Sequence, residues 1–215
     1  MPRTHPLYEV FMGASKGEFP PADGSVEVVP ASPGLPAAIV AFTAHHFVAA
    51  DVDPDWVRKR VGADPVGTPL TSAFMQELAA RVGASTGGID AVLACRPPHE
   101  SGTIDLVAMN EAFEHPRVSL ARSFRRDVRV YATRDGSGIL VLGRGLAGRL
   151  EVSFEVESTS RSGGLGRRLL QAGLRLAGGE PVFAQVAPGN AASLRAVLSV
   201  GFRPIGAEAW FRPVT

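Results

Sequence analysis

The sequence predicts a mixed α/β fold, in which a mostly antiparallel central sheet carries helices on both faces. The first observation behind this prediction is a run of three short segments rich in apolar residues, at 128–133, 139–143 and 150–156, the last of which alternates apolar and polar residues. Glycine-containing turns separate them, which is typical of consecutive antiparallel strands. The second observation is that the two-residue period then changes to a helical period after residue 163.

Strand and helix keep alternating to the end of the chain. A helix is predicted over 164–177, with apolar residues on one side and Gly178 at its end. A strand at 181–187, a short helix that begins near Asn190 and a last strand at 203–211 follow. These elements complete the predicted sheet.

The N-terminal part also has helices and strands in α/β proportion. Residues 1–36 are rich in Pro and Gly, so we expect an extended arm with a short strand at 25–29. Residues 35–50 are apolar without a clean period, which leaves a helix or a buried strand open. Helices are predicted after Asp53, over 71–82 and over 117–126, and strands at 89–94 and 103–109.

Composition indicates a globular protein. The 215 residues are 45% hydrophobic, enough for one large domain or two small halves. The net charge of +1 provides no overall field that would attract nucleic acid or an anionic membrane. No apolar run has the length of a membrane span, and the N-terminus lacks the features of a signal peptide, so we expect a cytoplasmic protein.

Cysteine and histidine give no sign of a metal site. The single cysteine, Cys95, follows an apolar run and is expected to be a buried core thiol. His45 and His46 are adjacent, so on a strand they point to opposite faces and on a helix about 100° apart. They cannot easily bind one metal together. A structural or surface role is expected, and a role in a pocket for one of them is the alternative.

The turn between residues 157 and 166 is the most informative segment. Gly163, Gly164 and Gly166 allow backbone N–H groups to approach an anion without a Cβ in the way. The helix that begins here directs its unsatisfied N–H groups and its positive dipole end to the same place. A pyrophosphate would fit such a turn.

Two spaced motifs in this part resemble the GNAT superfamily, the acetyl-CoA-dependent N-acetyltransferases. Arg161-x-x-Gly164-x-Gly166 is similar to the acyl-CoA pyrophosphate loop of that family, and Asn190-x-x-Ser193 with a later Gly-Phe pair is similar to its next helix. The resemblance covers roughly residues 127–211. A dinucleotide-binding turn would need a further Gly or Ala where Leu169 stands, and an ordinary glycine-rich loop is the other alternative.

The resemblance implies two domains, a GNAT-like core at 127–215 and an N-terminal α/β extension at 1–126. The extension either forms the acceptor site, which we favour, or is a degenerate GNAT-like half. The implied activity is that of an acyl-CoA-dependent N-acyltransferase, which moves acetyl from acetyl-CoA to a primary amine of a small molecule or peptide. No metal, nucleic acid or membrane is implied, and a homodimer is an open option.

The resemblance also implies which residues act. The residues expected to bind the cofactor are Phe154, Glu155, Val156, Arg161, Ser162, Gly163, Gly164, Leu165, Gly166, Arg167, Asn190 and Ser193. Asn190 would in any case cap its helix, and Arg167 could equally belong to a solvated helix face. Glu155 and Glu151 share one strand face and are the candidate general bases, if burial raises a carboxyl pKa toward neutrality. The alternative is that they face solvent or pair with neighbouring arginines, and we favour it for Glu151.

One departure from the family pattern bears on activity. Many members carry a tyrosine seven positions after the helix-opening asparagine, and it protonates the departing thiolate. This chain has Val197 there, and its only tyrosines are Tyr8 and Tyr131. A non-catalytic acyl-CoA-binding regulatory module is therefore the alternative function.

Overall fold

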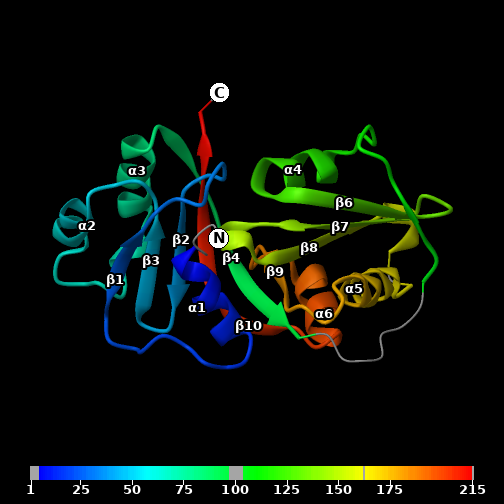
Figure 1. Ribbon diagram of the computed structural model, residues 1–215, viewed down its shortest axis with the longest axis horizontal. Helices are drawn as coiled ribbons and strands as arrows, with labels where there is room; N and C mark the ends of the chain where they lie inside the picture. Colours follow the sequence, from blue (N-terminus) through cyan, green and yellow to red (C-terminus); the bar gives the residue numbers. More distant parts are fainter. Residues whose placement is uncertain (1–4, 97–103, 162, 215) are drawn as a thin grey trace. The chain divides into compact units, whose positions relative to one another are not determined.

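The computed structural model describes residues 5–96, 104–161 and 163–214 (Figure 1). The chain divides into two compact units, one of residues 1–92 with 205–215 and the other of residues 93–204. Strands β4 (Ala84–Cys95) and β10 (Arg203–Pro213) contribute residues to both units. The two domains that the resemblance implies, residues 1–126 and 127–215, stay a prediction.

The first unit is a sheet with the strand order β1-β3-β2-β10-β4. Its remaining elements are α1 (Pro6–Ala14), β1 (Val26–Val29), β2 (Ala38–Phe42), β3 (His45–Ala49), α2 (Pro54–Val61) and α3 (Ser72–Arg81). Strands β2 and β3 form an antiparallel hairpin, while β1 runs parallel to β3. Helices α2 and α3 pack on the face of Ile39 and Val48, and Phe11 of α1 contacts Phe42 on the other face.

Two expectations for this unit need correction. Residues 6–14 are helical rather than part of an extended arm, because Pro6 begins the helix and the side chain of His5 accepts a hydrogen bond from the backbone of Leu7. Residues 35–50, for which helix and strand were both open, form the β2–β3 hairpin. The lack of a period has a physical reason, since every residue of both strands is buried.

The second unit has the strand order β4-β9-β8-β7-β6-β5. Its remaining elements are β5 (Leu106–Ala108), α4 (Pro116–Phe124), β6 (Arg126–Thr133), β7 (Gly138–Arg144), β8 (Leu150–Val156), α5 (Leu165–Leu176), β9 (Val182–Val186) and α6 (Ala191–Ser199). Strands β5 to β8 are an antiparallel meander, and β8 runs parallel to β9. The predicted fold class, a mixed and mostly antiparallel sheet, is confirmed.

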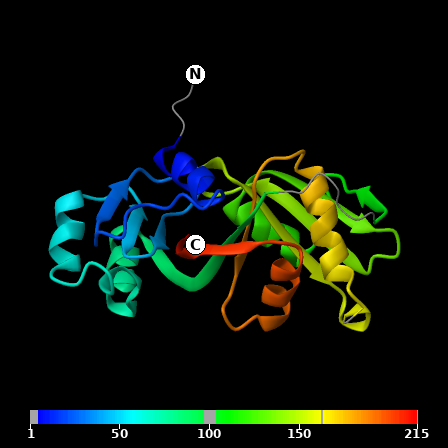
Figure 2. The ribbon, with the colours of Figure 1, turned by 90° about the horizontal axis from the view of Figure 1, so that it is seen from below.

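Helices cover both faces of this second sheet (Figure 1). Val118 of α4 packs on Ile139 and Val141 of β7, whereas Gly173 of α5 lies against Leu140 on the other face. Strand β7 is consequently buried on both sides. Helices α5 and α6 lie side by side on one face, as the view in Figure 2 also shows.

Among the described residues, no helix combines the length and apolar character that crossing a membrane would require.

Candidate acyl-CoA site

Strands β8 and β9 separate soon after they meet. Their parallel ladder joins Leu150 to Val182 and Glu151 to Phe183, and it includes no later pair. Yet β8 continues to Val156 and β9 to Val186. On its other edge β8 stays paired with β7 along its whole length. Within the described ranges, no strand pairs with this edge of β8 from residue 152 onward, so backbone groups there can face a ligand.

The glycine-rich turn follows this open edge directly. After β8, a short 3-10 helix at Ser158–Ser160 leads to Arg161, and Gly164 is the N-cap residue of α5. Gly164 has a φ of 73°, in the left-handed region that favours glycine. It has no side chain with which to cap the helix, so the first N–H groups of α5 remain available to an anion.

The other two glycines of the turn serve different purposes. A Cβ on Gly166 would lie 2.8 Å from the Phe154 ring, so glycine here allows α5 to approach β8 closely. Among the described residues, the nearest atom to a Cβ at Gly163 would be the carbonyl oxygen of Ser160, at 3.9 Å. Packing against the described residues therefore leaves room beside the backbone at 163.

Three arginines lie at the turn or in the first turn of α5. Arg161 is exposed and donates a long hydrogen bond, 3.4 Å, to the carbonyl oxygen of Val156. Arg168 donates to the carbonyl oxygen of Gly163 over 3.3 Å, and sequence reasoning did not single it out. Arg167 is exposed on the first turn of α5. Ser162, also expected to bind the cofactor, lies outside the described residues.

The second motif folds as its chemistry suggests. Asn190 is the N-cap residue of α6, and its side-chain oxygen accepts a hydrogen bond from the backbone N–H of Ser193 over 3.1 Å. The capping role of Asn190 is thus confirmed, while a cofactor contact for Asn190 and Ser193 stays a prediction. Val197 is buried and has no group that could donate a proton. Tyr131 lies on β6, which β7 separates from β8.

The two candidate bases have different surroundings. Glu155 is partly exposed at the end of β8, and Arg117 of α4 donates to it over 3.1 Å. Glu151 is fully buried between Arg125 and Arg149, each at 2.9 Å. Burial would raise the pKa of the Glu151 carboxyl, but the two guanidinium groups outweigh it and hold the pKa below its usual value. The favoured alternative for Glu151, pairing with arginines, is therefore confirmed.

Sequence reasoning missed the partners of these carboxylates. Arg149 could have been found, because it lies two positions before Glu151 on the same strand face. Arg117 and Arg125 are 38 and 26 residues away from their partners, and only the fold brings them near.

The remaining candidates are structural. Cys95 is buried and free, and burial raises the pKa of its thiol, as expected for a core residue. His45 and His46 point to opposite faces of β3. His45 contacts the carboxylates of Asp23 and Glu27, both at 3.1 Å. Among the described residues, no group of three or more His, Cys, Asp or Glu side chains could hold a metal ion.

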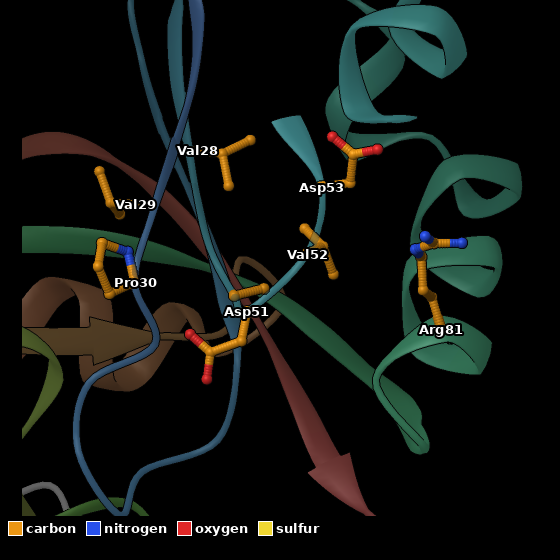
Figure 3. A pocket seen from close by; sticks show the side chains of 8 residues that line it. Val28, Val29, Pro30, Asp51, Val52, Asp53 and Arg81 are labelled. Atoms are coloured by element: carbon orange, nitrogen blue, oxygen red, sulfur yellow. The ribbon is translucent and has the colours of Figure 1, made fainter. Parts of the chain in front are cut away.

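Two hollows lie in the first unit, and none of the predicted site residues lines them. One, of about 770 Å³, is found where β1 and β3 end, beside Arg81 of α3 (Figure 3). Its carboxylates already have partners, since Asp51 accepts from the backbone of Ala31 and Asp53 caps α2. The other, of about 550 Å³, lies between α1, residues 18–21 and the strands β1 and β3.

No family model and no curated protein matches the sequence. Solved structures that resemble the fold include a protein of the GNAT family from Novosphingobium aromaticivorans, with 22% identity, a TM-score of 0.42 and coverage of 62% of this chain and 69% of that one. A GCN5-related N-acetyltransferase from Kribbella flavida has 15% identity and a TM-score of 0.42, and the match covers 66% of this chain and 64% of that one. A GCN5-related N-acetyltransferase from Sphaerobacter thermophilus has 18% identity and a TM-score of 0.39, and the match covers 66% of this chain and 56% of that one.

These proteins carry the name of the family that the sequence motifs resemble. The chain spans less than two thirds of the Kribbella and Sphaerobacter proteins. Because all three TM-scores lie below 0.5 and all three identities below 25%, the case for an activity rests on the residues of this chain.

Proposed function

We propose that this protein is an acyl-CoA-dependent N-acyltransferase that moves acetyl from acetyl-CoA to a primary amine of a small molecule or peptide. The observation that carries the proposal is the order of two features along the chain, an open edge on β8 and then a glycine-rich turn. The strand leaves its neighbour β9 after Glu151 and then runs into the turn that opens α5 at Gly164. A thioester with a pantetheine arm and a pyrophosphate needs an extended edge and an anion site in this order.

The residues present fit acetyl-CoA. The open edge of Phe154, Glu155 and Val156 would hydrogen-bond the pantetheine arm. The turn from Arg161 through Leu165 to Arg167 would hold the pyrophosphate with backbone N–H groups and guanidinium charge. Asn190 and Ser193 at the start of α6 would contact the cofactor from the neighbouring helix. When bound, acetyl-CoA supplies an activated acyl carbonyl.

The transfer forms a C–N bond and breaks the C–S bond, so the amine must lose protons and the thiolate must gain one. Backbone N–H groups fixed by the sheet stabilise negative charge that develops on the carbonyl oxygen. Glu155 is the proposed base, because its partly exposed carboxylate can receive a proton, whereas Glu151 is enclosed by two arginines. Of the two protons that an ammonium acceptor loses, one goes to the base and the other balances the proton that the thiolate gains.

The experiment that tests this function follows free thiol while the protein is incubated with acetyl-CoA and a mixture of primary amines. Thiol release that depends on the amine supports the proposal. Binding of acetyl-CoA without such release favours a second candidate, a non-catalytic acyl-CoA-binding regulatory module. The observation in favour of that candidate is Val197, which is buried at the position where the family often has a tyrosine.

A further inference from the structure

Arg125 connects the two strands at the point where they separate. It is the C-cap residue of α4, and its side chain is only 10% exposed. Its Nε donates to Glu151 Oε2 and its Nη1 to Ser153 Oγ, both over 2.9 Å. Its Nη2 donates to Gln185 Oε1 over 3.3 Å. Glu151 and Ser153 belong to β8, whereas Gln185 belongs to β9.

The register shows why this position matters. The ladder pairs Leu150 with Val182 and Glu151 with Phe183, so Ser153 and Gln185 would be opposite each other if it continued. They are the first pair beyond the ladder whose side chains share the face of Glu151. The guanidinium of Arg125 therefore bonds both strands at the place where their backbones no longer bond each other.

The surrounding sequence makes room for this arginine. A Cβ on Gly143 of β7 would lie 3.0 Å from the Cβ of Arg125 and 3.1 Å from the carbonyl oxygen of Arg126. A Cβ on Gly145 would overlap the carboxylate of Glu151. The two glycines thus leave space for the buried pair, and Arg149 holds the other oxygen of the carboxylate.

We infer that Arg125 is a positioning residue that fixes the spacing between β8 and β9 through Ser153 and Gln185, and thereby places the acyl thioester. This inference rests on the proposed function. Arg125 does not enter the chemistry itself, because each of its three guanidinium nitrogens donates to a protein oxygen and it acts through the strands. A lysine at this position would keep the positive charge, but its ammonium group lacks the planar geometry with which the guanidinium group makes these three hydrogen bonds.

The test compares Arg125→Lys and Gln185→Leu with wild type. Arg122→Lys is the matched control, because Arg122 lies on the same helix and donates to the backbone carbonyl of Glu111 at the surface. We expect kcat to fall tenfold or more in both variants, since small misplacement of reacting groups has large effects on rate. The dissociation constant for coenzyme A should stay within twofold, because the pyrophosphate turn is unchanged. Arg122→Lys should behave as wild type.

Two further outcomes separate the inference from the proposed function. If Arg125→Lys and Gln185→Leu remain folded and retain the kcat of wild type, the inference is overturned while the function stands. If wild type shows no amine-dependent turnover, the function fails, and hydrogen exchange at residues 152–156 and 184–186 becomes the readout. Faster exchange in both variants than in Arg122→Lys supports the inference, and unchanged exchange overturns it.

Discussion

Glu151 provides a sharp test of the energetics of this site. Its carboxylate is 1% exposed, and each oxygen accepts a charge-assisted hydrogen bond of 2.9 Å, from Arg125 and from Arg149. Arg149 is fully buried. Glu151→Gln keeps the shape of the side chain but removes the negative charge between two guanidinium groups.

The expected cost is large. Removing one partner of a buried ion pair destabilises a protein by about 3–5 kcal/mol, because a buried charge is left uncompensated. For a chain of this size, each kcal/mol corresponds to a fall in Tm of about 2–4 °C, so we expect a decrease of about 6–20 °C. Urea denaturation should show a lower midpoint with an unchanged slope.

Glu180→Gln is the control. Glu180 pairs with Arg144 in the same unit, but its side chain is 27% exposed, so its loss should cost about 0–1 kcal/mol. The reasoning would be refuted if Glu151→Gln lost less than about 1 kcal/mol or no more than Glu180→Gln.

Three further predictions follow from the same geometry. The Glu151 carboxyl has a folded-state pKa below its unfolded value of about 4.3. Its contribution to stability is therefore present above that pH and is lost as the pH falls through the folded-state pKa. Urea midpoints measured between pH 6 and pH 3 should decline more steeply in wild type than in Glu151→Gln. Gly163→Val should leave the free energy of unfolding within about 0.5 kcal/mol, since a Cβ there meets no atom of the described residues nearer than 3.9 Å. The same change should weaken coenzyme A binding at least tenfold by calorimetry, and equal affinity would remove Gly163 from the site. Glu155→Gln should lower kcat by about 10²–10⁴-fold and leave the dissociation constant of coenzyme A unchanged. Glu114→Gln, at an exposed position, should match wild type. If the kcat of Glu155→Gln equals that of wild type across the pH range, Glu155 is excluded as the base.

The fold of the C-terminal part could be predicted because its signals are local. Glycine-containing turns separate the strands β6 to β8, β8 alternates apolar and polar residues, and α5 has a clear apolar stripe between Gly164 and Gly178. Residues 35–50 could not be assigned, because strands buried on both faces show no alternation. Helix α1 was missed because the many prolines and glycines around it favour extended chain.

The parts of the candidate site that are contiguous in the amino-acid sequence could be predicted, and the others could not. The turn from Arg161 to Gly166 and the Asn190 cap could be recognised from spacing alone. The separation of β8 from β9 could not be predicted, because it depends on the register between strands whose paired residues are 32 positions apart. Nor could the contacts of Arg125, which join α4 to both strands across up to 60 residues of sequence.

The central claim is that the turn at 161–166 and the open edge of β8 together bind an acyl-CoA. Its most direct test is calorimetric titration of the wild-type protein with coenzyme A and with pantetheine, which lacks the pyrophosphate. Each charge-assisted hydrogen bond to the pyrophosphate contributes about 1.5–3 kcal/mol, so two of them predict that coenzyme A binds at least a hundredfold more tightly. No heat with coenzyme A, or equal affinity for the two compounds, would contradict the account.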